Sequence, residues 1–547
     1  MPADNLGALP SNIRATTEPV ARNLPGVELV VLALGVAAMA LVTWFDLQTS
    51  LPLLDEYARR WSIQMLVAGN GFQSLGSSPQ IVQLLLAFPL ALLKTDPAVW
   101  RLTSVPFIAM QGIFCGLIAR DLGAGRLWAL IAGVAVVSNP LNLTVATGMM
   151  TETVFLGLFA GAIWCSLRWI ERGESRWACI ALTVLAALQR PQGVAVAAAV
   201  LLGLVVFARR RRPLRAEVAP VAMLLLLSAA AYKAPAFLSS ISPRLTGSVS
   251  GSLGEVQRRY SGPSFGVYIL ANFPALLGLA SIPFAAAFWT ARSKEIAGRK
   301  YWWALPTMLA FLALAFAGLF VMESPGRSIF VGNMFGAHGL GAALLRGAKV
   351  SPFSGRLFLV VVVLSITSYV LLLVKNRDAW APAHLGEGGQ ILVLHAALQF
   401  AFIFGQGQLF DRYYLAMILP LMPIVAVAAA SAGTSPASVA WAVLALIASV
   451  VLYAIGTQDY VAWQVARHRV AQMAYAQAPV DQVEAGFEED AENIWLPADV
   501  DPTGTLPRYV VAEPKFELLF AGPDDPRAGV GYSSFGASGK VVIQRRQ

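Results

Sequence analysis

The stretch Ile81–Leu93, with the sequence IVQLLLAFPLALL, decides how this chain is arranged. As a helix it is only about 20 Å long, whereas the hydrocarbon core of a bilayer is about 30 Å thick. If this stretch crossed a membrane, the later clusters of Lys and Arg would lie outside the cell. If it lies along the membrane surface, those clusters lie in the cytoplasm, where such residues accumulate. We therefore predict a juxtamembrane helix at Ile81–Leu93.

The basic clusters that favour this choice are spread between apolar runs. They are Arg120 with Arg126, Arg168 with Arg172 and Arg176, Arg209–Arg212 with Arg215, Arg292 with Lys294, Arg299 and Lys300, and Lys375 with Arg377. All of them fall on the cytoplasmic side only when Ile81–Leu93 does not cross the membrane.

The composition is that of a protein embedded in a lipid bilayer. Of 547 residues, 57% are apolar and only 13% are charged, whereas about a quarter of the residues of a soluble domain are charged. This balance excludes a disordered chain, a disulfide-stapled secreted module and an ordinary cytosolic enzyme. The net charge is +9, but the basic residues form short clusters without a continuous stripe, so nucleic acid is not an expected partner.

We predict 13 membrane spans, beginning after a polar cytoplasmic tail of residues 1–26. The first span ends at Trp44-Phe45, an interfacial aromatic pair, and is retained rather than cleaved as a signal peptide. The other spans run over approximately 98–119, 127–142, 152–169, 177–189, 192–208, 217–238, 265–290, 301–322, 356–374, 388–404, 414–432 and 437–456.

These spans define a transmembrane domain over residues 27–456, with a first external loop over residues 45–97 and further long external loops over 239–263 and 323–355. The odd number of spans places residues 457–547 outside the cytoplasm. This tail contains short strand-like runs at Tyr509–Ala512 and Val541–Ile543. The predicted fold class is therefore an all-α polytopic membrane protein, with juxtamembrane helices in its first loop and a small C-terminal α/β appendage outside.

Two adjacent carboxylates, Asp55 and Glu56, lie in the first external loop. Apolar or aromatic residues recur every four positions from Tyr57, which predicts an amphipathic surface helix over Glu56–Ala68. Asp55 precedes this helix and is explained equally well as its N-cap. Alternatively, it is a carboxylate at the lipid–water boundary that takes a proton from an acceptor hydroxyl.

A third carboxylate, Glu152, lies at the outer end of a predicted span, in the run Thr147–Thr153. A carboxylate entering a membrane is unfavourable and tends to face a cavity or a cationic partner. A simple helix start is the alternative interpretation. The predicted topology places Glu152 on the same membrane face as Asp55 and Glu56, which favours a single site.

Several basic residues on the outer side are candidates for binding the phosphate of a lipid-linked donor. Each of them could instead extend to lipid headgroups, although Arg190 and Lys233 are harder to explain in this way because positive charge is usually kept from that side. The candidates are Arg101, Arg190, Lys233, Arg258, Arg259 and Arg412.

The remaining polar signals are weaker. His338 is a single loop histidine, for which a solvated or structural role is the simpler interpretation; with Tyr57 and Tyr413 it is a candidate contact for the acceptor or the sugar. His395 lies in the middle of a span and is expected to be packed and hydrogen-bonded. The three cysteines, Cys115, Cys165 and Cys179, lie in apolar runs without metal-ligand spacing, so neither disulfides nor a Cys-based zinc site is expected. Because a donor phosphate is already a good leaving group, no cofactor is expected to be required, and a divalent metal is not indicated.

The order of these motifs resembles a known family. After the external Asp55-Glu56 come Trp100-Arg101, Asn139-Pro140, Met150-Thr151-Glu152, Gln189-Arg190-Pro191-Gln192-Gly193 and Asp411-Arg412-Tyr413-Tyr414. The chain resembles the bacterial glycosyltransferase family 39 proteins, relatives of the dolichyl-phosphate-mannose–protein mannosyltransferases in the GT-C superfamily. The resemblance covers most of residues 27–456.

The resemblance implies transfer of a single sugar from a polyprenyl-phosphate carrier to an acceptor outside the bacterial cytoplasmic membrane, usually with inversion. The acceptor would be an envelope glycan, a glycolipid or a protein. By this resemblance, Asp55 matches the catalytic acid of the first loop and Glu152 the second acidic position, while Arg190 and Arg412 match basic positions near the donor. The sequence contains no MIR-type domain, so a protein acceptor is not implied, and no large globular domain, so transfer of a whole oligosaccharide is disfavoured.

These observations predict a division of labour. Asp55 would deprotonate the acceptor hydroxyl, and Glu56 and Glu152 would orient it or hold the sugar. Arg190, with Lys233 or Arg412, would compensate the charge of the departing phosphate. Two rival functions stay open: a transporter or flippase for a lipid-linked or small anionic substrate, and a non-catalytic subunit of an envelope-assembly complex.

Overall fold

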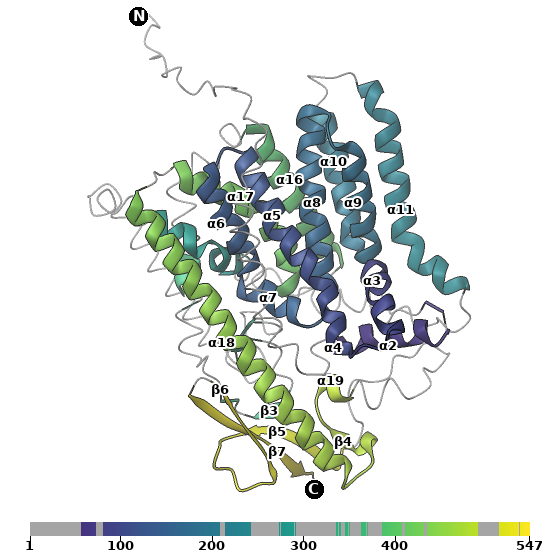
Figure 1. Cartoon of the computed structure of the whole chain (residues 1–547), viewed down its shortest axis with the longest axis vertical. Helices are drawn as coiled ribbons and strands as arrows, with labels where there is room; N and C mark the ends of the chain where they lie inside the picture. Colours follow the sequence, from purple (N-terminus) through teal and green to yellow (C-terminus); the bar gives the residue numbers. More distant parts are fainter. Residues whose placement is uncertain are drawn as a thin grey trace, which may run out of the picture.

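A computed structural model shows a bundle of helices with a small β-sheet at one end (Figure 1). The structure describes residues 56–69, 71–72, 80–207, 214–241, 273, 275–288, 290, 335–336, 339–340, 345–347, 349–350, 361, 363–367, 369, 386–406, 411–431, 435–490, 514–534 and 536–546. The predicted first span and the span over 301–322 lie outside these residues.

The first loop forms the two short helices that the sequence predicts. Helix α2 spans Glu56–Val67 and α3 spans Ile81–Leu92. They are followed by α4 (Pro97–Trp100), a 3-10 turn η2 (Arg101–Ser104) and α5 (Val105–Asp121). In Figure 1, α2 and α3 lie at the end of the bundle that carries the sheet.

The helical bundle is built around α8 (Thr151–Arg172), whose side chains are almost all buried. The other helices of the bundle are α6 (Gly125–Val137), α9 (Arg176–Gln189), α10 (Val194–Val206), α11 (Val218–Ile241), a helical stretch over 275–288, α16 (Gly386–Gln406) and α17 (Leu415–Ser431). The core of the bundle is apolar, with Phe155 and Phe159 stacked at 5.4 Å between ring centroids.

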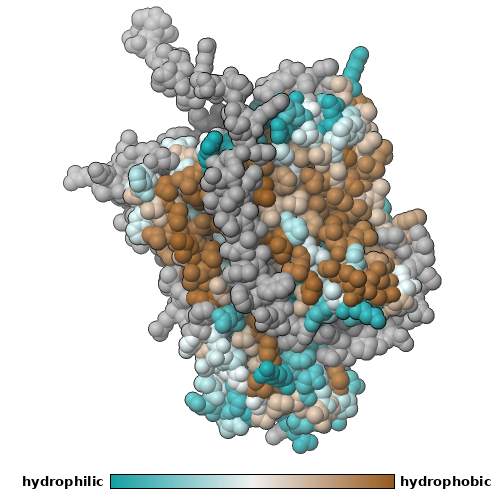
Figure 2. All heavy atoms as spheres, viewed as in Figure 1, coloured by the Kyte–Doolittle hydropathy of each residue, from teal (hydrophilic) through white to brown (hydrophobic). Residues whose placement is uncertain are grey.

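The outer surface of the bundle is apolar as well. Leu226 on α11 and Leu444 on α18 (Pro436–Tyr475) are exposed, and Figure 2 shows apolar surface across the bundle and more hydrophilic surface around the sheet. Among the described residues, five helices are long and apolar enough to cross a membrane. An apolar exterior on helices of this length belongs to a membrane protein.

The predicted span over 127–142 is too long. Helix α6 ends at Val137, and a separate helix α7 (Pro140–Thr147) follows at an angle to it (Figure 1). The break arises because Asn139 caps α7, its Oδ1 accepting a hydrogen bond from the Leu141 N–H at 2.9 Å, and because Pro140 occupies the first helical position.

Helix α18 extends beyond residue 456, the predicted end of the last span. Helix α18 continues without a break to Tyr475, because residues 457–475 contain neither Pro nor Gly and keep a buried stripe at helical spacing. Tyr460, Trp463 and Arg467 lie on this stripe, and the Trp463 ring meets the Phe520 ring of the sheet at 5.3 Å between centroids. The appendage predicted from residue 457 therefore begins as an extension of the last helix.

The small C-terminal sheet predicted from the sequence is present. Its strands are β3 (Arg346–Gly347), β4 (Val483–Glu484), β5 (Phe516–Ala521), β6 (Gly529–Ser534) and β7 (Ala537–Arg545), in the order β3-β5-β7-β6 with β4 also paired to β5. The predicted strand Val541–Ile543 lies within β7, whereas Tyr509–Ala512 lies outside the described residues.

One strand of this sheet comes from residues 27–456, the predicted transmembrane domain. Strand β3 lies in the loop predicted over 323–355 and pairs in parallel with β5, with Arg346 opposite Leu519. The same loop contains the two-residue strands β1 (Phe335–Gly336) and β2 (Gly339–Leu340). Near β3, the Lys349 Nζ donates to Asp459 Oδ2 on α18 at 2.7 Å. The sheet is thereby joined to the loop as well as to α18.

Candidate functional site

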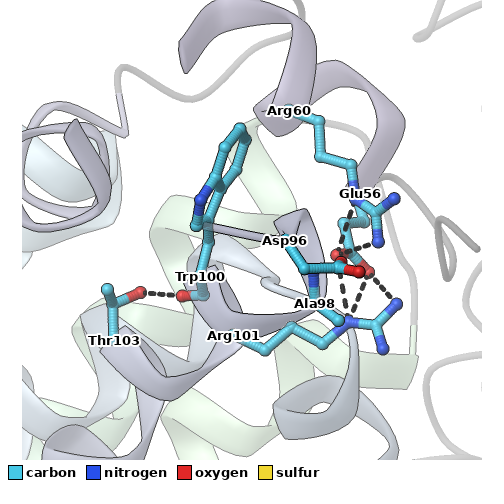
Figure 3. A network of polar contacts seen from close by, with 7 residues as sticks. All are labelled: Glu56, Arg60, Asp96, Ala98, Trp100, Arg101 and Thr103. Atoms are coloured by element: carbon cyan, nitrogen blue, oxygen red, sulfur yellow. Dashed lines mark hydrogen bonds and ion pairs between the residues drawn. The ribbon is translucent and has the colours of Figure 1, made fainter. Parts of the chain in front are cut away.

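Glu56, the first residue of α2, is completely buried between two guanidinium groups (Figure 3). Arg60, one turn further along α2, donates to Glu56 Oε1 through its Nε at 3.0 Å and its Nη2 at 2.8 Å. The Arg101 Nε donates to both carboxylate oxygens at 3.0 Å, and its Nη2 lies 2.9 Å from Oε2. We call these three residues the Glu56 cluster.

The position of Arg101 follows from the short helix before it. Asp96 caps α4, its Oδ1 accepting from the Ala98 N–H at 2.8 Å, and Pro97 follows as the first helical residue. The 3-10 turn η2 then begins at Arg101, and the Thr103 hydroxyl donates to the Trp100 carbonyl at 2.7 Å (Figure 3). The Arg101 side chain is thus directed from this turn onto α2.

Glu152, in the first turn of α8, is also held by two arginines. The Arg190 Nη1 forms an ion pair with Glu152 Oε1, and the Arg412 Nε lies 2.9 Å from the same oxygen. The Thr151 hydroxyl donates to Glu152 Oε2 at 3.2 Å and accepts from Arg190 Nη1 at 3.3 Å. The Tyr413 ring packs against both arginines, its centroid 4.7 Å from the Arg190 Cζ and 5.6 Å from the Arg412 Cζ. We call these five residues the Glu152 cluster.

The two arginines of the Glu152 cluster come from separate turns between helices. Arg190 follows α9 in an extended conformation, as expected for a residue before proline, and the 3-10 turn η3 (Pro191–Gly193) follows. Gly193 is required there, since a Cβ at this position would lie 2.3 Å from the Ala187 backbone nitrogen. Arg412 belongs to the 3-10 turn η7 (Asp411–Tyr414), which leads into α17.

The two clusters lie at the same end of the bundle and are joined by apolar packing. A compact group of buried side chains contains Ile63 of α2, Leu84 of α3, Trp100 of α4 and Met149 of the turn before α8. Met149 is three residues from Glu152, and Ile63 is on the helix that begins at Glu56. Figure 1 shows α2, α4 and α7 at the sheet end of the bundle.

The structure thus divides the predicted donor-binding residues. Arg190 and Arg412 meet at Glu152, with Tyr413 beside them, whereas Arg101 pairs with Glu56. Lys233 is exposed on α11, where its Nζ lies 5.7 Å from the Tyr232 ring centroid, and neither cluster contains it. Tyr57 is buried on α2 next to Glu56. Asp55, Arg258, Arg259 and His338 lie outside the described residues.

Other predicted polar residues behave as packed groups. His395 is buried, and its Nε2 lies 2.9 Å from the Ser166 hydroxyl. Cys115, Cys165 and Cys179 are free and buried. Within the described part of the chain, His, Cys, Asp and Glu side chains form no group of three suited to a metal ion.

Arg60 and Thr151 belong to these clusters and Gln189 contacts Thr151, but none of the three had a predicted role. The signal for Arg60 was present, because a Glu and an Arg four residues apart on a helix form a favourable pair. Thr151 and Gln189 carry no comparable pattern, since their contacts depend on how α3, α8 and α9 come together.

Comparisons with known proteins give no family assignment from sequence: no protein-family profile matches the chain, and no curated protein matches it. The solved structures that are similar to it include two of one protein. One is ArnT from Cupriavidus metallidurans bound to undecaprenyl phosphate, with 17% sequence identity and a TM-score of 0.42 over 94% of this chain and 98% of that chain. The other is the same protein in the apo state, with 15% identity and a TM-score of 0.39 over the same shares of the two chains.

Proposed function

We propose that this protein is a membrane glycosyltransferase that moves a single sugar from a polyprenyl-phosphate-linked donor to an acceptor outside the cytoplasmic membrane. The observation that carries the proposal is the Glu152 cluster. Two guanidinium groups from separate turns converge on one buried carboxylate, at the end of the bundle where the helix that follows Asp55 also begins.

The donor phosphate binds beside Arg190 in this proposal. Arg190 is buried, and its Nε has no hydrogen-bond partner among the described residues. A guanidinium group carries five N–H donors and binds phosphate oxygens well, so a buried Nε–H without a partner favours an anionic ligand there. The polyprenyl chain would extend along the apolar outer surface of the bundle into the lipid.

Glu152 acts as a fixed anion that orients the arginines. Its Oε1 is paired with both guanidinium groups and its Oε2 accepts from Thr151, so it is poorly suited to take a proton during the reaction. Glu56 is engaged in the same way by Arg60 and Arg101 and anchors the start of α2. Proton removal is therefore assigned to Asp55, the residue that precedes α2 in the sequence.

The proposed reaction is a substitution at the anomeric carbon. The acceptor hydroxyl gives its proton to the Asp55 carboxylate, and its oxygen forms a bond to the sugar. The bond between that carbon and the phosphate oxygen breaks on the opposite face, with inversion, and polyprenyl phosphate leaves. Arg190 and Arg412 compensate its charge, and preorganised cations in a site shielded from water lower the barrier to such a step.

The experiment compares envelope glycans and lipids, by mass spectrometry, from cells that lack this protein and carry wild type, Asp55→Asn or Asp121→Asn. We expect one sugar modification to be lost without the protein and restored by wild type. The rate of modification by Asp55→Asn should fall at least about 100-fold, as after removal of a general base. Asp121 lies at the far end of α5, where it accepts from the Trp164 Nε1–H, so Asp121→Asn should behave as wild type.

Two other results would replace the proposal. If no covalent product is missing but a lipid-linked or anionic substrate fails to cross the membrane in proteoliposomes, the protein is a transporter. If Asp55→Asn restores the modification fully while an envelope-assembly complex is lost without the protein, the protein is a non-catalytic subunit.

A further inference from the structure

Gln189, the last residue of α9, is completely buried and contacts two other segments of the chain. Its side-chain Oε1 accepts from the Gln83 backbone N–H of α3 at 3.1 Å. Its Nε2 donates to the Thr151 carbonyl at the start of α8 at 3.3 Å and lies 3.5 Å from Gln83 Oε1. Its own carbonyl accepts from the Gln80 N–H at 3.1 Å. One residue therefore holds together the ends of three helices.

On one side, these contacts lead to α2. Gln80 has a φ of 48°, a left-handed backbone conformation that a residue with a side chain adopts only when its surroundings hold it there. The Gln189 carbonyl holds its N–H, and the Gln80 Nε2 donates to the Ser62 hydroxyl of α2 at 3.3 Å. The contacts of Gln189 thus extend to the helix that begins at Glu56.

On the other side, the contacts lead directly into the Glu152 cluster. Thr151 accepts from Gln189 through its carbonyl, and its hydroxyl contacts both Arg190 and Glu152. Arg190 is also the next residue after Gln189 in the chain. A displacement of Gln189 would therefore move the Arg190 backbone and the Thr151 carbonyl together.

We infer that Gln189 is a positioning residue that couples the first-loop helix α2 to the Arg190–Glu152 pair. This inference rests on the proposed function, because the two parts it couples are the acceptor side and the donor side of the same transfer site. In Figure 1, α3 lies between α9 and α2, as this connection requires. Small misalignments of reacting groups lower rates strongly, so the coupling should affect turnover more than donor binding.

The first measurement tests the coupling without any assay of activity. Spin labels are attached at Gln64→Cys on α2 and Leu185→Cys on α9, two exposed positions, while the three native cysteines are buried. We compare Gln189→Met, which keeps the length of the side chain but removes its hydrogen bonds, with Gln464→Met, a matched change of a buried glutamine on α18. The distance distribution should broaden in Gln189→Met and stay as in wild type in Gln464→Met.

The second measurement is the rate of sugar transfer. In Gln189→Met, kcat should fall about tenfold, the effect of roughly one buried hydrogen bond left unmade. The KM for the donor should stay within about twofold, since Arg190 itself is retained. A purely structural role would instead lower the fraction of folded protein and leave kcat per folded molecule unchanged.

The outcomes separate the two proposals. An unchanged distance distribution in Gln189→Met, or a broadened one with an unchanged kcat, overturns the inference. If the wild-type protein transfers no sugar, the proposed function fails, and the distance distribution alone then decides whether Gln189 holds α2 to α9.

Discussion

The Glu56 cluster and the Glu152 cluster share a core of one carboxylate and two arginines, but these arginines come from different places in the chain. In each, one buried carboxylate is held by two arginines. In the Glu56 cluster one partner, Arg60, is on the same helix, and the other lies 45 residues on. In the Glu152 cluster both arginines come from other segments, one after α9 and one before α17.

This difference suggests different roles for the two clusters. The Glu56 cluster fixes the first-loop helix α2, whose first eight residues are buried, against the turn that follows α4. The Glu152 cluster joins three segments and has a buried Nε–H on Arg190 without a partner among the described residues, so it has the donor needed for an anionic ligand. We therefore assign the donor phosphate to the Glu152 cluster and the support of Asp55 to the Glu56 cluster.

The largest expected effect is on stability. Glu152→Gln leaves two buried guanidinium groups without their shared carboxylate and releases three segments, which should lower the free energy of unfolding by about 3–5 kcal/mol. Glu56→Gln should lower it by about 1–3 kcal/mol, because Arg60 stays ordered on its own helix. Thermal unfolding of both variants in detergent measures the two losses of stability. An equal or greater loss for Glu56→Gln would contradict the comparison.

The next effect is on ligand binding. Arg190→Ala should weaken the binding of a polyprenyl phosphate about 100-fold, because a charge-assisted contact to phosphate is lost in a buried site. Arg60→Ala is the matched control, because Arg60 is also buried and is one of two arginines that hold a carboxylate, and it should change the affinity by no more than about threefold. Titrations of the lipid, followed by native mass spectrometry, compare them. Similar losses in both variants would mean that the clusters are not specialised.

A smaller effect, on the rate of sugar transfer, is expected when an arginine is replaced by a residue of the same charge but different geometry. Arg412→Lys keeps the charge but removes the guanidinium group whose Nε lies 2.9 Å from Glu152 Oε1 in an ion pair, and a lysine cannot reproduce the planar arrangement of donors. We expect transfer to fall about tenfold, and only about twofold for Arg60→Lys. Steady-state kinetics of the two variants provide the test, and wild-type activity of Arg412→Lys would remove Arg412 from the site.

Asp490 is a buried carboxylate that forms no direct ion pair with any arginine of the described residues, and its pKa is shifted. Burial raises the pKa of Asp490 to about 7, although the Ala485 N–H donates to its Oδ1 at 2.9 Å and Arg467 lies nearby. Since the folded-state pKa lies above the unfolded one, its contribution to stability is present at low pH and is lost as the pH rises through about 7.

The smallest expected effect is that of Asp490 titration on the unfolding temperature. Between about pH 5 and pH 8, the unfolding midpoint of wild type should fall by a few degrees relative to that of Asp490→Asn, whose side chain does not titrate. Thermal unfolding at several pH values measures the difference between the two proteins. Parallel curves would show that Asp490 does not titrate in this range.

Much of this fold could be predicted from the pattern of residues in the sequence. The four-residue spacing of apolar residues predicted α2, and the length of an apolar run predicted α3, both almost to the residue, because these are local properties of the sequence. The extension of α18 to Tyr475 was not predicted, because its buried stripe packs on a sheet that only the folded chain provides. The end of α6 was missed although Asn139 and Pro140 mark it clearly.

Less of the candidate site could be predicted from the sequence. Glu56 and Glu152 were identified as unusual carboxylates, but their partners depend on which segments meet. Arg101 was grouped with Arg190 as a donor-binding residue, yet it pairs with Glu56, and Lys233 lies exposed on α11. Gln189 had no pattern of its own, since its contacts depend on how the ends of α3, α8 and α9 come together.

The most direct test of the account is an experimental structure of the protein with a polyprenyl phosphate bound. We predict the phosphate within hydrogen-bonding distance of the Arg190 Nε, at the end of the bundle that carries the sheet, with the Asp55 carboxylate facing it. A phosphate bound at the opposite end of the bundle or beside Lys233, or Asp55 and Glu152 found at opposite ends, would contradict the account.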